Sequence, residues 1–91
     1  MAATAIWVNI DERLVVPALR EAGEKLNHAD GEALLDFSSV HRVDSSTLRA
    51  LEAFARIADD KAVKVTLRGV NVDVYKVFKL VKLTQRFSFV S

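Results

Sequence analysis

Three residues of the kinds that hydrolases combine lie close together in the middle of the chain. Asp36, His41 and Ser45 could serve as acid, base and nucleophile. No glycine-flanked turn surrounds Ser45, however, and such a turn is what exposes the nucleophile in many of these enzymes. Because residues of these types often coincide by chance within so short a stretch, we predict no catalytic triad. His41 is interpreted as a surface loop residue and His28 as a polar residue near a helix end.

The segment around Ser45 combines an aspartate with two serines. Asp44, Ser45 and Ser46 precede a run with helical apolar spacing, and their side-chain oxygens can accept hydrogen bonds from the free amides of a helix start. One such oxygen is enough for a cap. Three such side chains slightly exceed what a cap requires, which makes the stretch from Leu34 to Leu51 the most informative part of the chain.

Strands and helices that could position this stretch alternate along the sequence. Runs rich in β-branched, aromatic or alternating apolar residues predict four strands, at residues 4–10, 32–37, 63–68 and 87–90. Helical apolar spacing predicts three helices between them, at residues 14–28, 45–58 and 71–83. Pro17 fits the first turn of the first helix, and Asn71 can cap the third. The order β-α-β-α-β-α-β predicts one α/β domain over residues 1–91, with a mixed, mostly parallel four-stranded sheet covered by helices.

Apolar spacing also predicts which side chains face inward. On the first helix these are Leu14, Ala18, Ala22 and Leu26. On the third helix they are Val74, Val77, Phe78 and Val81. The predicted common core consists of Leu35, Phe37, Leu48, Leu51, Val65, Leu67, Val74 and Phe78.

Composition limits the classes of function. The chain has 91 residues, 51% hydrophobic and 27% charged, as in one small globular domain. It has no cysteine, which excludes disulfides and cysteine-based zinc sites, and its two histidines leave little for another metal site. Its three glycines form neither of the phosphate-binding nucleotide motifs, so no cofactor is predicted. Because no apolar run has the length of a membrane span and no signal peptide is recognisable, we expect a soluble, cytoplasmic protein without a transmembrane segment.

Charge is distributed unevenly along the chain. Residues 61–91 hold seven basic side chains and a single acid, Asp73, whereas residues 1–60 hold eleven acids and six bases. Lys76, Lys79 and Lys82 lie on neighbouring parts of one predicted helix face, and Arg86 follows. A solvated face at the negative end of the helix dipole explains this pattern, and a patch for anionic lipid or an acidic partner is the alternative. Because the aromatic residues are expected to face inward and the net charge is only +1, no nucleic acid partner is predicted.

The stretch from Leu34 to Leu51 resembles the central motif of the STAS domain, a family found in bacterial anti-sigma factor antagonists and at the C-termini of sulfate transporters. The family pattern is an apolar strand followed by D-[LF]-S-x-V and, a few residues later, by D-S-S-G-L at a helix start. Residues 36–40 (DFSSV) and 44–48 (DSSTL) match this pattern in order and spacing. Thr47 departs from it, because it replaces the family glycine.

This resemblance implies a non-enzymatic protein-interaction module. In the anti-sigma factor antagonists the anti-sigma factor, a serine kinase, phosphorylates the first serine of the motif. The dephosphorylated form binds that kinase and frees the sigma factor. Carried over by position, the phosphoacceptor is Ser45, and the residues expected at the partner interface are Asp44, Ser45, Ser46, Thr47 and Arg49.

A second branch of the family is the STAS subunit of the bacterial phospholipid-transport ABC system. It binds the ATPase subunit of that transporter and lacks a phosphoacceptor serine. Residues 65–80 (VTLRGVNVDVYKVFKL) resemble this branch, whereas Ser45 and Ser46 favour the first. The apolar edges expected of a short four-stranded sheet predict, in addition, a weak homodimer.

Overall fold

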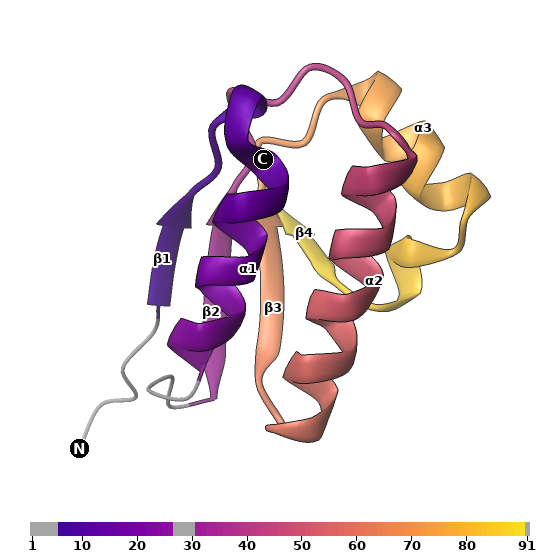
Figure 1. The fold of residues 1–91 in the computed structure, drawn as a ribbon. Helices are drawn as coiled ribbons and strands as arrows, with labels where there is room; N and C mark the ends of the chain where they lie inside the picture. Colours follow the sequence, from indigo (N-terminus) through magenta and orange to yellow (C-terminus); the bar gives the residue numbers. More distant parts are fainter. Residues whose placement is uncertain (1–5, 27–30, 91) are drawn as a thin grey trace.

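The computed structural model describes residues 6–26 and 31–90, in which strands and helices alternate in the predicted order (Figure 1). The strands are β1 (Ile6–Asn9), β2 (Glu32–Asp36), β3 (Lys64–Arg68) and β4 (Ser88–Val90). The α-helices are α1 (Val15–Lys25), α2 (Ser45–Asp60) and α3 (Val72–Leu80). Short 3-10 turns, Glu12–Leu14 and Leu83–Gln85, precede α1 and β4. The expected strand residues 4 and 5 and the expected helix end at His28 lie outside the described residues.

The sheet is parallel throughout. Its strand order is β1-β2-β3-β4, and all three neighbouring pairs run in the same direction. The expectation of a mixed sheet is therefore wrong. The physical reason is that a helix follows each of the first three strands and returns the chain to the end of the sheet at which that strand began.

All three α-helices lie on one face of the sheet (Figure 1). Right-handed crossovers that add strands in one direction only place every helix on the same side. Val8, Leu35, Leu67 and Phe89 are paired across the four strands and face the helices, with Leu35 and Leu67 fully buried. On the opposite face Trp7 is 58% exposed.

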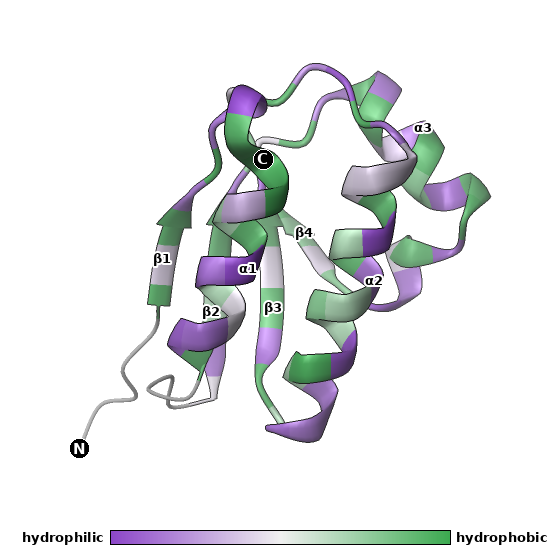
Figure 2. Ribbon diagram, in the orientation of Figure 1, coloured by the Kyte–Doolittle hydropathy of each residue, from purple (hydrophilic) through white to green (hydrophobic). Residues whose placement is uncertain are grey.

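The core fills the space between the sheet and the helices. All of the predicted core residues are buried except Leu48, which is half-buried and packs against the core from its edge. Figure 2 shows that α1 and α2 each carry hydrophobic and hydrophilic residues, the amphipathic pattern that the sequence predicts.

The inward face predicted for α1 is partly wrong. Leu14 precedes the helix and is exposed, whereas Val15 and Leu19 are buried together with Ala22 and Leu26. The predicted residues follow one another at a constant spacing of four, which drifts around a helix of 3.6 residues per turn. The buried set alternates spacings of four and three and therefore stays on one side.

The third helix ends earlier than predicted. Its last residue is Leu80, and Lys82 then adopts the left-handed conformation, with φ of 64°, which breaks the helical path. Val74 and Phe78 face inward as expected, and Val77 is half-buried. Val81 is exposed, so its predicted inward orientation is wrong, because it lies beyond the regular helix.

Aromatic side chains are not all inside. Phe37, Phe54 and Phe78 are buried as expected, but Trp7 and Tyr75 are substantially exposed. The predicted inward orientation is therefore wrong for these two residues. Trp7 lies on the sheet face that the α-helices leave open, and the guanidinium carbon of Arg68 lies 5.4 Å from the centre of its ring.

Candidate functional site

The carboxyl ends of the four strands meet at one edge of the sheet because the strands are parallel (Figure 1). The connections that follow β1, β2 and β3 therefore lie side by side at this edge. They bring together Glu12, the loop of residues 37–44 and Asn71. α2 begins at the same edge with Ser45. The predicted site residues Asp44, Ser45 and Ser46 lie at this edge, which makes it the candidate site.

Asp44 caps α2 with its side chain. Its backbone is extended, and its Oδ1 accepts a hydrogen bond of 2.8 Å from the backbone amide of Thr47. This donation from the Thr47 amide holds the pKa of Asp44 below its ordinary value, because the amide stabilises the charged carboxylate. The predicted helix cap is confirmed, and Asp44 alone provides it.

Both serines of the motif are exposed in the first turn of α2. Neither the Ser45 nor the Ser46 hydroxyl forms a hydrogen bond with another described residue, since the capping position is already taken by Asp44. Thr47 differs from them because it is buried, with 6% of its surface exposed. Its side chain belongs to the interior of the first turn, so any effect of Thr47 on a partner would be indirect. Arg49 is exposed one turn further along the helix.

Two residues from neighbouring connections hold the loop that leads to α2. Glu12 Oε1 accepts hydrogen bonds from the backbone amides of His41 and Arg42, at 2.8 and 3.1 Å. From the other side, Asn71 Nδ2 donates to the carbonyl oxygens of Val40 and His41, both at 3.4 Å. Glu12 therefore binds backbone amides of the loop, and Asn71 binds its backbone carbonyl groups.

The same contacts have electrostatic consequences for Glu12. The His41 amide is the main group that lowers the pKa of Glu12, and the Arg42 amide acts in the same direction. The sequence analysis missed this role of Glu12. No local pattern marks it, because its two partners lie 29 and 30 positions further along the chain. Asn71 was predicted as a cap of α3, and its Oδ1 does accept a hydrogen bond from the Val74 amide at 2.8 Å. The hydrogen bonds from Asn71 to the loop were not predicted.

Asp36 and Ser38 form a local turn that depends on a glycine. The hydroxyl and the backbone amide of Ser38 both donate to Asp36 Oδ1, and the hydroxyl is the main group that lowers the pKa of Asp36. Gly69 lies against this turn with φ of 73°, and a Cβ there would clash with Ser38 Oγ. The DFS part of the motif therefore builds the loop, and only glycine fits beside it.

The acid and the base of the rejected triad contact other residues instead of Ser45. Asp36 accepts from Ser38, and His41 Nδ1 lies 3.7 Å from Glu12 Oε2. No hydrogen bond joins either residue to Ser45 in the described part of the chain. His41 is exposed in the loop, as predicted.

A groove between α1 and α2 continues from the serine motif. Its volume is about 580 Å³, and it runs from Ser46 at one end of α2 to Lys61 beyond the other end. Apolar and small residues line most of it: Val16, Leu19, Gly23, Ala50, Ala53, Phe54 and Ile57. Gly23 brings the helices close, because a Cβ at this position would lie 3.4 Å from Cδ1 of Ile57.

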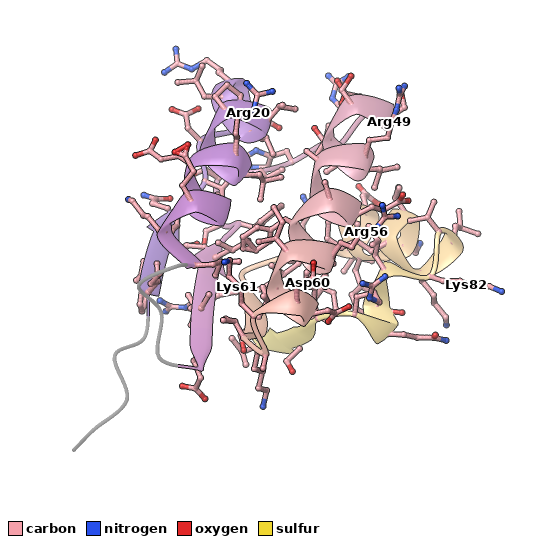
Figure 3. The ribbon with its side chains drawn as sticks, turned by 60° about the horizontal axis from the view of Figure 1, so that its bottom comes forward. Arg20, Arg49, Arg56, Asp60, Lys61 and Lys82 are labelled. Atoms are coloured by element: carbon pink, nitrogen blue, oxygen red, sulfur yellow. The ribbon has the colours of Figure 1, made fainter. Side chains whose placement is uncertain are left out.

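Basic side chains border this groove. Figure 3 shows Arg20 on α1 and Arg49 on α2 toward one end of the two helices, and Lys61 toward the other. Glu24 is the one acidic residue among those that line the groove. The groove therefore combines an apolar lining with a net positive border, directly beside the exposed serines.

Within the described ranges, no cluster of three potential metal-binding side chains occurs. The helices of that part of the chain are also too short or too polar to cross a membrane.

Comparison with known proteins identifies the family. The model of a family described as Mlab, STAS domain matches residues 11–90. The chain belongs to the STAS domain family. The resemblance carried by residues 36–40 and 44–48 is thereby confirmed. No curated protein matches the chain.

Solved structures share the fold of this STAS domain. The crystal structure of TM1081, a candidate anti-sigma factor antagonist of Thermotoga maritima, superposes with a TM-score of 0.76, at 15% identity, over 99% of this chain and 85% of that one. The NMR structure of TM1081 gives 0.77 at 16% identity, over 96% and 74%. The Bacillus cell fate determinant SpoIIAA in its phosphorylated form gives 0.64 at 16% identity, over 96% and 79%. These likenesses establish that the STAS domain described here has the fold of anti-sigma factor antagonists.

Proposed function

We propose that this STAS domain is a non-enzymatic binding module of the anti-sigma factor antagonist type, which a serine kinase binds and phosphorylates at Ser45. The observation that carries the proposal is the free hydroxyl of Ser45. It is exposed in the first turn of α2, and the helix does not need it because Asp44 already caps the Thr47 amide. A kinase requires an accessible hydroxyl of this kind.

Phosphorylation would change the surface rather than the fold. A phosphoryl group adds about −1.5 to −2 charges, and the positive end of the helix dipole favours it at this position. Asp44 repels it, whereas Arg49 lies four residues further along the helix, a spacing at which opposite charges attract. Arg49 forms no ion pair with another described residue, so its guanidinium is available. The balance of these effects keeps α2 in place and alters the charge that a partner meets.

The fold comparison supports this proposal. SpoIIAA was determined in its phosphorylated form, and its fold matches that of the present chain. A domain of this architecture therefore tolerates a phosphoryl group.

The partner surface that we propose consists of Asp44, Ser45, Ser46 and Arg49 together with the adjoining groove. Ser46 and Arg49 belong to both, because they line the groove at its serine end. A phosphate on Ser45 would attract Arg49 and add bulk beside the serine end of the groove. The unphosphorylated form therefore binds the kinase more tightly.

Partner capture followed by titration tests the proposal. The tagged chain is expressed in its native cells, its partners are identified by mass spectrometry, and its phosphorylation site is mapped. We expect a serine kinase and a phosphate on Ser45. Titration of that kinase by calorimetry should show that Ser45→Asp weakens binding at least about tenfold, which is about 1.4 kcal/mol. Ser45→Ala should bind as the wild type does.

Matched controls separate the switch from a loss of folding. Both Ser45 variants should keep melting temperatures near that of the wild type, because the Ser45 hydroxyl has no partner among the described residues. Ser46→Ala removes the neighbouring hydroxyl and should still be phosphorylated on Ser45. Equal affinity of the kinase for wild type and Ser45→Asp would contradict the proposal.

The second candidate function is that of the STAS subunit which binds the ATPase of an ABC-type lipid transporter. It is favoured by the resemblance of residues 65–80 to that branch and by the family name Mlab of the model that matches. The same capture experiment distinguishes the two candidates. An ABC-type ATPase as the main partner, with no phosphate on Ser45, would support the second and exclude the first.

A further inference from the structure

The outer side of α3 exposes more apolar surface than a solvated helix face needs. Leu80 is 83% exposed and Val72 is 68% exposed, and Val81 follows at the end of the helix with 40%. Val72 and Leu80 are eight residues apart, and Lys76 lies midway between them, so the three share one side of the helix. Figure 2 shows hydrophobic residues along α3 out to its C-terminal end.

Lysines surround these apolar side chains. Lys76, Lys79 and Lys82 are all exposed, and none forms an ion pair with another described residue. Figure 3 shows Lys82 pointing away from the body of the protein. Arg86 differs, because its guanidinium binds the carboxylate of Asp59. The acid of this region, Asp73, lies in the first turn of α3, at the opposite end from Lys79 and Lys82.

The apolar and basic residues together form one surface, which we call the α3 face. It consists of Val72, Lys76, Lys79 and Leu80 on the outer side of the helix, together with Val81 and Lys82, which are exposed directly after its last residue. We propose that the α3 face docks on a membrane surface that contains anionic phospholipid. The apolar side chains would enter the interfacial region while the lysines contact the lipid phosphates.

The shape of the α3 face favours a membrane over a folded protein partner. α3 lies at the outer margin of the molecule (Figure 1), and the side chain of Leu80 is almost fully exposed to solvent. A specific protein interface buries about 800 Å² per partner with close shape complementarity, whereas the exposed apolar side chains of this nine-residue helix are separated by lysines. A lipid interface accepts a projecting side chain at any position, because the lipids rearrange around it.

The inference is independent of the proposed function. Ser45 begins α2 at the carboxyl edge of the sheet, whereas the residues substituted in the test below, Lys79, Leu80 and Lys82, lie at the C-terminal end of α3. Kinase binding and membrane docking can therefore succeed or fail separately.

Vesicle sedimentation tests the inference on the full chain. One set of vesicles is pure phosphatidylcholine, and the other is equal parts phosphatidylcholine and phosphatidylglycerol. We expect binding to the anionic vesicles only, and we expect added salt to weaken it. Lys79→Gln/Lys82→Gln should reduce binding about 25-fold, since each lysine near an anionic surface contributes roughly a fivefold factor. Leu80→Ser should reduce it about tenfold.

A charge-matched control distinguishes the α3 face from general attraction. Arg56→Gln/Lys64→Gln removes the same number of positive charges from exposed positions outside this face. It should retain most of the binding. Equal losses in the two double variants, or no binding of the wild type to anionic vesicles, would overturn the inference. Because all the substituted side chains are exposed, circular dichroism should show the same fold in every variant.

Discussion

Glu12 accepts a hydrogen bond of 2.8 Å from the backbone amide of His41, and this contact ties the turn before α1 to the loop before Ser45. The same carboxylate also accepts from the amide of Arg42. Glu12→Ala should therefore loosen the loop without unfolding the domain. Hydrogen exchange should be faster at the amides of His41 and Arg42, whereas the amides of the β2–β3 ladder should be unaffected. Unchanged exchange at both loop amides would show that the contact does not hold the loop.

Acid should destabilise the domain through carboxylates whose pKa the fold lowers, among them Asp44, Glu12 and Asp36. The pKa of Asp44 is lowered chiefly by the Thr47 amide, that of Glu12 by the His41 amide and that of Asp36 by the Ser38 hydroxyl. In the unfolded chain the ordinary values are 3.8 for aspartate and 4.5 for glutamate. Each group therefore contributes stability that is fully present above its ordinary pKa and is lost as the pH falls through its lowered value.

Thermal melts across the acid range check this expectation. The melting temperature should be nearly constant above about pH 5 and should fall below about pH 4. Asp44→Asn keeps a side chain that can cap the helix but removes the charge, so its decline should be shallower. Asp60→Asn is the control, because Asp60 is exposed and accepts no hydrogen bond from the described residues. A decline equally steep in wild type and Asp44→Asn would show that Asp44 does not contribute.

A buried and an exposed leucine test which side chains belong to the core. Leu51 is fully buried, so Leu51→Ala should lower the free energy of unfolding by about 2–5 kcal/mol. Leu80→Ala removes the same atoms from an exposed site and should change it by less than about 0.5 kcal/mol. Urea unfolding measures both. A small effect of Leu51→Ala would mean that α2 does not face the sheet as described.

Alanine substitutions at Gly69 and Gly31 distinguish the cost of backbone strain from that of a steric clash. Both have positive φ, 73° and 91°, so alanine at either position should cost about 1–2 kcal/mol from conformation alone. Only at Gly69 would the added Cβ also clash with a neighbour, Ser38 Oγ. At Gly31 no atom lies within 4 Å of the added Cβ. Gly69→Ala should therefore be clearly more destabilising than Gly31→Ala in urea unfolding. Equal losses would exclude a role for the contact with Ser38.

The open face of the sheet suggests where copies of the chain would meet. Parallel sheets are almost always covered on both faces, yet Trp7 is exposed on the face opposite the helices. We expect a weak homodimer that Trp7→Ser disrupts. Sedimentation equilibrium over a range of concentrations measures the dimer, and Trp7 fluorescence reports the same contact because it is the sole tryptophan. A monomer at high concentration would exclude the dimer.

Local features of this chain could be predicted from its sequence because they depend on neighbours only a few positions apart. The alternation of strands and helices follows from apolar periodicity. The Asp44 and Asn71 caps follow from side chains that reach an amide three residues ahead. The motif at residues 36–48 combines both signals, so the family and the position of Ser45 at a helix start were predictable from the chain itself.

Only the tertiary structure decided how these elements face one another. The wholly parallel sheet and its single helix-covered face depend on the direction in which the crossovers add strands, which no local pattern records. The contact of Glu12 with the loop joins residues 29 positions apart. Val81 is apolar in the sequence but exposed in the fold because α3 ends before it, and Leu80 is exposed because it lies on the outer side of α3. Burial depends on the elements that happen to pack nearby, and that is a property of the whole chain rather than of any segment.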